Sequence, residues 1–504
     1  MTSGRRPEDP ARAGDENYES AIGPEDAVAR TRLESMSQVK RELFAKRLAG
    51  QGSGLASAPV QAKPVALLGH ANADLAFWSG SLSYAEERFW MAYMLQDQSS
   101  AYHIPATLRL TGKLDVAALS RALEMIMARH DILRTRYPVT PEGELTAVVD
   151  KLSAVRLEAV LADGDPREVL SRATAEPFDL EAGPLIRPVL LKTADNEHYL
   201  HFTLHHIITD GWSMMNLLDE LTATYNSQVL GIPADLPELT MQYRDHALQQ
   251  RTHAGQFEDQ AAYWQQALSG APHDLGLHTD RPRQAFAAVP GKNLICTFGV
   301  GPARELARQT RTTLFMVLLG AFATVLGRHS DSEDVVIGTP VAGRRNPASE
   351  PLLGCFINTV AIRTDLSGDP TFGELLGRVR KQTLRAYDNQ DMPFQHVARE
   401  RTERSGVRST FIQAWMALQN FPEPSLAMTG LVVKEIPITT DATKFDITFY
   451  LCETGGQMEL EVEYDSSLFE DETVRGFARE FVAVLDCGAG NPDRRLSELI
   501  GARA

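Results

Sequence analysis

The chain changes its hydrophobic period abruptly between residues 199 and 221. Residues 199–204 alternate in character as a half-buried strand does, whereas residues 212–221 carry apolar side chains at helical spacing. Residues 205–211, HHIITDG in one-letter code, stand between them. A strand is therefore predicted to end and a helix to begin here, where side chains are held firmly and backbone N–H groups point outward. This junction is the candidate site for chemistry.

The two adjacent histidines are compatible with three kinds of site. A histidine beside an acid suits proton transfer, a buried pair can be purely structural, and histidines are also zinc ligands. In a strand His205 and His206 point to opposite faces, so only one of them enters a given cavity. The chain has no HExxH and no CxxC motif, which disfavours zinc. Spacing alone leaves the catalytic and the structural interpretation open.

The composition is that of a globular protein with a surplus of acidic residues. Of 504 residues, 43% are hydrophobic and 23% charged, and the net charge is −16. This charge argues against nucleic acid as a partner. No apolar run reaches about 18 residues, and the first ten residues lack the apolar core of a secretion signal. We therefore predict no membrane span and expect a cytoplasmic location.

The cysteines indicate neither a disulfide framework nor a metal site nor a nucleophile. They lie far apart in sequence without paired spacing, which suits reduced thiols in the cytosol. They are Cys296, Cys355, Cys452 and Cys487. Together with the missing zinc motifs, this pattern predicts that the site holds no metal.

Composition and periodicity divide the chain into three parts. Residues 1–75 combine a polar, Pro- and Gly-rich tail that we predict to be disordered, a helix with one apolar face at 25–48, and a linker. The helix either packs on the body or docks a partner. Residues 76–270 and 271–504 are predicted to form two lobes, because residues 270–291 break any periodicity.

Both lobes mix helices and strands. The helix at 313–322 is apolar nearly all round and is therefore expected to be buried. Two similar α+β lobes with a cleft between them are the simplest interpretation. The other predicted elements are helices at 84–91 and 116–129 and strands at 107–110, 187–191, 198–205, 335–338, 445–451 and 458–464.

Several stretches, taken in order, resemble the condensation domains of nonribosomal peptide synthetases, which belong to the HHxxxDG acyltransferase superfamily. The match is most specific at residues 205–213, which fit HHxxxDGWS. Glu86 stands where glutamine is usual, and Thr410 where proline is expected. The resemblance covers roughly residues 80–500. The other matching stretches are residues 83–90, 129–135, 243–247, 337–344, 353–359, 390–394 and 408–413.

The resemblance implies two chloramphenicol-acetyltransferase-like lobes in a V-shaped pseudodimer, with the histidine motif in a central tunnel. It implies an acyltransferase that joins a donor acyl or aminoacyl thioester to an acceptor amine. A donor carrier protein is expected to bring its substrate on phosphopantetheine, and the acceptor to arrive on a second carrier protein or in soluble form. No cofactor is expected on this chain, which is predicted to be a monomer without nucleic-acid or membrane partners.

The residues of the junction then take separate roles. His206 is predicted to be catalytic, as a base or as a group that positions the amine. Gly211 permits close approach of the substrate, and its N–H is placed to stabilise an oxyanion. His205 faces the other way and is predicted to be structural. The resemblance pairs Asp210 with Arg344 of the second lobe, also as a structural contact.

Three more residues are candidates for contacts with substrate in the tunnel: Trp212, Ser213 and Asn358. Packing is the commoner role for a tryptophan such as Trp212. Ser213 is expected to cap the helix rather than to act as a nucleophile, because the reaction needs no acyl-enzyme.

Related activities must be weighed against condensation. Epimerization domains continue differently after the glycine, and heterocyclization domains replace the two histidines with aspartates, so residues 205–213 favour condensation. A freestanding acyltransferase that uses a soluble amine or alcohol is the main alternative. A non-catalytic recruitment platform is another, although such platforms commonly lose the second histidine, which is present here as His206.

Overall fold

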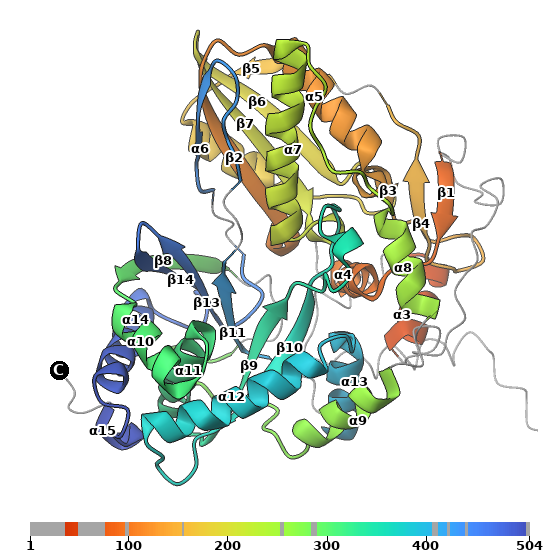
Figure 1. The fold of residues 1–504 in the computed structure, drawn as a ribbon. Coiled ribbons are helices and arrows are strands. Elements are labelled where there is room, and N and C mark those ends of the chain that lie inside the picture. The colour runs from red at the N-terminus through yellow and green to blue at the C-terminus, as the bar shows by residue number, and fades with distance from the viewer. Residues whose placement is uncertain are drawn as a thin grey trace, which may run out of the picture.

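The computed structural model contains two interlocking lobes, one above the other in Figure 1. The predicted disordered tail, the start of the helix at 25–48 and the linker lie outside the described residues. The described residues are 36–48, 76–95, 100–153, 156–252, 257–283, 290–405, 412–420, 424–438 and 442–499.

A five-stranded sheet forms the first lobe, in the order β12-β2-β7-β6-β5, in which β12 is Leu431–Glu435. The predicted strands at 187–191 and 198–205 are confirmed, and they pair as a hairpin with Leu190 of β6 opposite Leu200 of β7. Helices α5 and α7 lie side by side along this sheet (Figure 1). The elements are β2 His103–Gly112, α5 Val116–Arg129, β5 Ala159–Leu161, α6 Pro166–Ala175, β6 Ile186–Ala194, β7 Glu197–His205 and α7 Gly211–Leu230.

A small sheet in the order β1-β4-β3 and three helices flank the first lobe. In helix α3, Phe44 is fully buried in the first lobe's core, and Arg47 forms an ion pair with Glu87 of α4. The described part of the predicted amphipathic helix therefore packs on the body. The elements are α3 Gln38–Leu48, β1 Ala76–Gly80, α4 Tyr84–Leu95, η3 Ser100–Tyr102, η4 Asp131–Arg134, β3 Thr135–Arg136, β4 Ala147–Asp150 and α8 Tyr243–Thr252.

The second lobe is built on a six-stranded sheet in the order β10-β9-β11-β13-β14-β8. Strand β11 runs parallel to β9 and β13, and the other neighbours are antiparallel. Its strands are β8 Gly291–Phe298, β9 Asp334–Val341, β10 Asn358–Asp365, β11 Ala414–Gln419, β13 Ile447–Thr454 and β14 Gln457–Asp465. Its helices are α9 Glu258–Ala267, α10 Gly301–Thr310, α11 Leu314–His329, α12 Phe372–Asp388, α13 Phe394–Ser405, α14 Asp471–Gly490 and α15 Leu496–Leu499.

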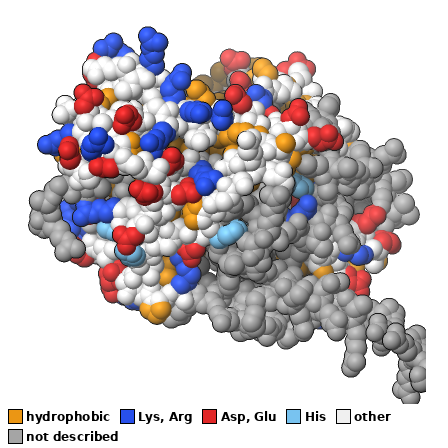
Figure 2. Space-filling view, turned by 90° about the horizontal axis from the view of Figure 1, so that it is seen from below, with side chains coloured by type: hydrophobic (Ala, Val, Ile, Leu, Met, Phe, Trp, Pro, Cys, Tyr) orange, Lys and Arg blue, Asp and Glu red, His pale blue; other side chains and the backbone are white. Residues whose placement is uncertain are grey.

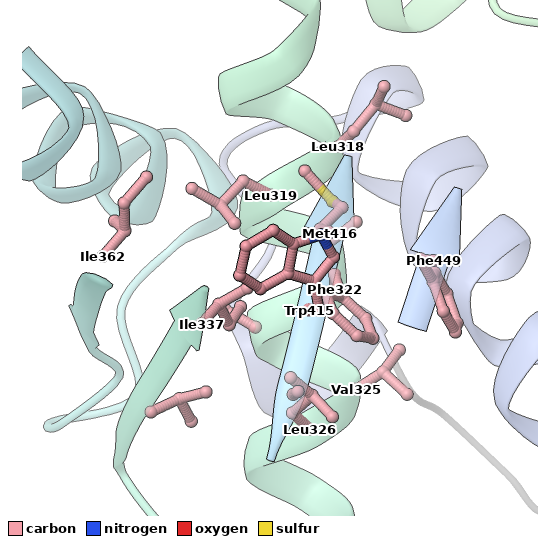
Figure 3. Close-up of a cluster of buried hydrophobic side chains, with 14 of the residues drawn as sticks. Leu318, Leu319, Phe322, Val325, Leu326, Ile337, Ile362, Trp415, Met416 and Phe449 are labelled. Carbon is pink, nitrogen blue, oxygen red and sulfur yellow. The ribbon is translucent and has the colours of Figure 1, made fainter. Parts of the chain in front are cut away.

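Helix α11 is the centre of the second lobe's core, as its uniformly apolar sequence predicted. Figure 3 shows Phe322 of this helix among Ile337 of β9, Met416 of β11 and Phe449 of β13. The rings of Phe322 and Phe449 stack with centroids 4.2 Å apart. Helix α11 is buried on all sides and packs on one face of the second lobe's sheet. The opposite face of this sheet is turned toward the first lobe (Figure 1).

The two lobes exchange segments. Strand β12 (Leu431–Glu435) follows the second lobe's β11 in sequence but pairs with β2 of the first lobe. The loop between β9 and β10, which contains η7 (Pro347–Ser349), buries Leu352 and Phe356 in the first lobe's core. Trp264 of α9, from the segment assigned by sequence to the first lobe, packs in the core of the second. The mixed α+β class is confirmed, and the lobes are interlocked rather than merely adjacent.

Figure 2 shows basic and acidic side chains interspersed over the described surface seen from below. Neither sign is gathered in one field on this face. Within the described residues no single helix is long and apolar enough to span a membrane, although α10 and α11, bent by 105°, pass that test as a pair.

Candidate active site

His206 stands where β7 ends, at the first position of the short helix η5 (His206–Ile208). Its Nδ1 lies 2.8 Å from the carbonyl oxygen of Thr209. Because a carbonyl can only accept, Nδ1 carries the proton and the lone pair remains on Nε2. No described residue forms a hydrogen bond with Nε2. The strand-to-turn junction therefore presents a neutral imidazole with one vacant acceptor.

The surroundings of His206 keep it neutral. Its ring stacks on Phe89 of α4 with centroids 4.6 Å apart, and Phe89 meets Tyr102 edge-on at 5.3 Å. Burial, followed by the charge of Lys444, lowers the pKa of His206 to about 3. Adding a proton at pH 7 then costs about 5 kcal/mol, at 1.36 kcal/mol per pKa unit. The imidazole is accordingly better suited to accept a hydrogen bond than to take up a proton fully.

His205 is the last residue of β7 and is buried. Its Nδ1 accepts a hydrogen bond of 3.1 Å from the backbone N–H of Ile207. Burial lowers the pKa of His205 well below its usual value. Its ring contacts Phe178 edge-on at 6.1 Å. The two histidines thus have different environments, and His205 closes the turn that carries His206.

Asp210 joins three segments at the start of α7. Its Oδ1 accepts from the backbone N–H of Ser213 at 2.8 Å, and its Oδ2 accepts from the N–H of Phe356 at 2.9 Å. Nη2 of Arg344 lies 3.2 Å from Oδ1, and both side chains are at most 3% exposed. Arg344 also donates to the carbonyl of Leu352 at 2.9 Å. The pair therefore ties the first lobe to the β9–β10 loop of the second.

Ser213 belongs to the same interlobe contact. Its Oγ donates to the carbonyl of Gly354 at 2.6 Å and accepts from the N–H of Gly354 at 3.0 Å and from Arg344 at 2.7 Å. The expectation that Ser213 caps α7 is wrong, because Asp210 is the N-cap residue and its carboxylate is better placed to accept from the first turn.

Replacing Ser213 with alanine is expected to lower the free energy of unfolding by about 1–3 kcal/mol, because Gly354 and Arg344 lose a buried partner. Activity should stay above roughly a tenth of the wild-type value, since the hydroxyl is already occupied by three hydrogen bonds. Urea denaturation and product assays measure both effects. Ser227→Ala on the same helix is the control, because its hydroxyl donates only to Ile232. Loss of activity at unchanged stability would show that Ser213 takes part in the reaction itself.

The remaining predicted residues lie around this contact. Gly211 is the exposed first residue of α7. Trp212 donates from Nε1 to the carbonyl of Glu350 at 3.0 Å. The amide of Asn358 donates to the carbonyls of Gln390 and Met392 at 2.8 and 2.7 Å and accepts from the N–H of Phe394. Both side chains therefore hold backbone segments in place.

Sequence reasoning missed several groups close to His206. Lys444 reaches across from the second lobe, with its Nζ 5.4 Å from the ring centre of Tyr102. Arg88 donates to the carbonyl of Ile357 at 3.2 Å. The sulfur of Cys355 lies 3.9 Å from Nδ1 of His206, and burial raises the pKa of its thiol. Arg88 and Cys355 stand in the matching stretches 83–90 and 353–359 and could have been noticed there, whereas Lys444 stands in no pattern that signals a site.

In the part of the chain that the structure describes, no three or more His, Cys, Asp or Glu side chains are grouped so that they could hold a metal ion. The groups of this junction that are available for chemistry are the imidazole of His206, the backbone at Gly211 and the nearby charge of Lys444.

Comparison with known proteins identifies the class to which this fold and site belong. The family model for the condensation domain matches residues 80–501. A linear gramicidin synthase chain of Brevibacillus parabrevis is 37% identical over 434 residues, which are 83% of this chain. Tyrocidine synthase 2 of the same organism is 33% identical over 430 residues, again 83% of the chain. The chain belongs to the condensation-domain family.

Solved structures agree with this assignment. The X-domain from teicoplanin biosynthesis has a TM-score of 0.75 and 28% identity, and the match covers 83% of this chain and 96% of that one. The complex of that X-domain with OxyB matches with the same TM-score. The chain spans only 8% of the length of the gramicidin synthase and 12% of that of tyrocidine synthase 2. These relatives are synthetases much larger than this chain.

Proposed function

We propose that the chain forms an amide bond between a donor acyl or aminoacyl thioester and an acceptor amine, as a condensation domain of nonribosomal peptide synthesis. The observation that carries the proposal is the neutral imidazole of His206, whose Nε2 is left vacant beside the contact between the lobes. The donor arrives on the phosphopantetheine arm of a carrier protein. The acceptor arrives on a second carrier protein or as a soluble amine.

The reaction needs a free amine, a carbonyl held close to it and a path for one proton. The amine nitrogen attacks the thioester carbon, the carbon–sulfur bond breaks, and the amine proton ends on the leaving thiol. Nε2 of His206 accepts a hydrogen bond from the attacking amine and so orients its lone pair. The pKa of about 3 supports this positioning role over full proton uptake, because an imidazolium here would be costly.

The other junction residues support this chemistry in different ways. Gly211, at the start of α7, offers a backbone N–H to the oxyanion that forms on the carbonyl carbon. His205 keeps the turn in shape through Ile207. Asp210 and Arg344 hold the two lobes in register. The side chains of His205, Asp210 and Arg344 are not required to touch the reacting atoms.

Incubation with a loaded donor carrier and a panel of acceptors tests the function, with product followed by mass spectrometry. We expect an amide product when a carrier-bound aminoacyl acceptor is present. Product with only a soluble amine or alcohol would identify a freestanding acyltransferase instead. If no thioester and acceptor pair gives product, the catalytic proposal is wrong.

Replacing Lys444 with methionine is expected to raise the pKa of His206. Burial is the larger cause of the low pKa, and the Lys444 charge is the next, so removing the charge moves the pKa upward while burial keeps it below 6.5. The neutral acceptor would then be lost at a higher pH as the solution is acidified. NMR titration of ¹³C-labelled histidine measures this shift, with Lys444→Arg as the charge-retaining control. An unchanged titration would show that Lys444 does not act on His206.

A second candidate function rests on one structural match. The similar X-domain is found in a complex with OxyB, so a member of this fold can bind a separate protein. This chain would then recruit a partner enzyme rather than join substrates. Product formation that depends on His206 favours catalysis, whereas capture of a partner enzyme without any product from loaded carriers identifies the recruitment platform.

A further inference from the structure

The face of the second lobe's sheet that lies away from α11 carries a row of acidic residues. Phe449 of β13 stacks on α11, so its neighbour Tyr450 points to the opposite face. Strand β14 pairs with β13 and places Glu461 opposite Tyr450. Glu459 and Glu463 lie two residues to either side on the same face. We call Glu459, Glu461 and Glu463 the acidic row.

The exposure of the side chains on this face increases across the sheet from β11 to β8. Trp415 of β11 is 9% exposed, whereas Ile295 of β8, the cross-strand partner of Glu461, is 57% exposed. The acidic row lies between these two strands and is half-buried. Figure 1 shows α10, α11 and α14 on the other face of this sheet and the first lobe beyond the acidic one. Because Ile295 is exposed, the side of the row next to β8 is open to solvent.

Two members of the acidic row have no counter-charge among the described residues. Among the described residues, neither Glu459 nor Glu461 takes part in an ion pair. Burial and the two flanking glutamates raise the pKa of Glu461. Burial and the charges of Glu463 and Glu461 raise the pKa of Tyr450 well above its usual value. A positive group placed here would lower the pKa values of both Glu461 and Tyr450.

A second, independent feature marks the same face as unsatisfied. Thr448 lies opposite Glu463 in the register of β13 and β14, and its side chain is fully buried. Its Oγ1 has no hydrogen-bond partner in the structure. A buried hydroxyl without a partner is uncommon in folded proteins and leaves this position able to form one more hydrogen bond. It stands on the face that carries the acidic row.

The acidic row also adjoins the candidate active site. Lys444 interacts electrostatically with both His206 and Glu463: after burial, its charge is the next cause of the low pKa of His206, and burial lowers the pKa of Lys444 itself while Glu463 partly opposes that shift. Glu463 is held by a hydrogen bond of 2.8 Å from Oγ1 of Thr443, next to Lys444. Glu461 and Glu459, farther along the strand, are left for another cation.

We propose that Glu461, supported by Glu459 and the hydroxyl of Tyr450, binds an ammonium or guanidinium group on the side chain of one substrate. This inference rests on the proposed function and names a basic amino acid as the substrate class. Ile295 beside Glu461 gives the aliphatic stem of such a side chain an apolar contact. A basic side chain can belong to the donor or to the acceptor, and the experiment distinguishes these two cases.

Two matched pairs of small probes test the site. Lysine amide and norleucine amide represent the acceptor, and the lysyl and norleucyl thioesters of N-acetylcysteamine represent the donor. The members of each pair have the same α-amino group and differ in the side-chain ammonium. Calorimetry measures binding to the full chain, and mass spectrometry measures coupling. We expect the lysine member of one pair to bind about tenfold more tightly, as a charge-assisted hydrogen bond allows.

Glu461→Gln should reduce the preference for the lysine probe to about onefold, while binding of the norleucine probe stays unchanged. In the wild type, 0.5 M salt, which is about threefold above physiological ionic strength, should weaken the same preference. Glu472→Gln on α14, at the far side of the same sheet, makes the same charge change and should preserve it. Glu459→Gln replaces Glu461→Gln if melting shows that the latter is unfolded. An equal affinity for both probes in the wild type, or a preference that survives in the folded variant, overturns the inference. Absence of product with loaded carriers contradicts the proposed function, while the binding ratio of these probes still decides this inference.

Discussion

Replacing His206 with alanine is expected to lower product formation by about 10²–10⁴-fold, the usual contribution of a positioned acid–base group. The variant loses the Nε2 lone pair that orients the attacking amine, and it also loses the stacking partner of Phe89. The Michaelis constants should change much less than the turnover, because the lost interaction is strongest in the transition state. Single-turnover assays with a loaded donor carrier measure the effect directly.

His206→Asn separates the two roles that remain open for this residue. Asparagine keeps a hydrogen-bonding amide but takes up no proton, so it should retain part of the activity if positioning is sufficient. His278→Ala is the matched control, since His278 is 63% exposed and pairs with Asp331 far from the junction. Wild-type turnover in a folded His206→Ala variant would remove the residue from the mechanism. Identical losses in the alanine and asparagine variants would favour a true base.

Much of this site could be predicted because its residues are local in sequence. The change from alternating to helical period located the strand-to-helix junction, and the structure ends β7 at His205 and starts α7 at Gly211. The opposite orientation of adjacent strand residues separated the roles proposed for His205 and His206. The contact of Asp210 with Arg344 came from the family resemblance, since no period links residues 134 positions apart.

The parts that escaped prediction depend on contacts between distant segments. Strand β12 carries no sign that it joins β2, because pairing across more than 300 residues is decided by packing and not by local propensity. Lys444 precedes a strand that was predicted, yet only the folded interlobe contact places it over Tyr102. The break predicted near residue 270 likewise could not reveal that Trp264 packs in the second lobe, since its helix is equally compatible with either core.

Asp210→Asn is expected to destabilise the chain by about 3–5 kcal/mol, because it leaves the buried guanidinium of Arg344 without its counter-charge. In the wild type the backbone N–H groups of Ser213 and Phe356 both donate to the carboxylate. The asparagine amide would instead place its own N–H donors opposite one of these two donors. Activity should fall together with stability, since the same contact holds the β9–β10 loop against the start of α7. Urea denaturation and melting temperatures measure the loss.

A double-mutant cycle with Arg344→Met tests whether the two charges act as a pair. The double variant should lose less than the sum of the single losses, because removing both charges leaves neither uncompensated. Arg345→Met is the matched control: Arg345 pairs with Asp391 at the surface, where an ion pair contributes at most about 1 kcal/mol. If Asp210→Asn melts like the wild type but is inactive, Asp210 acts in the chemistry and the interlobe contact is not its main role. A loss of stability that Arg344→Met partly offsets places Asp210 in the structural frame that positions His206.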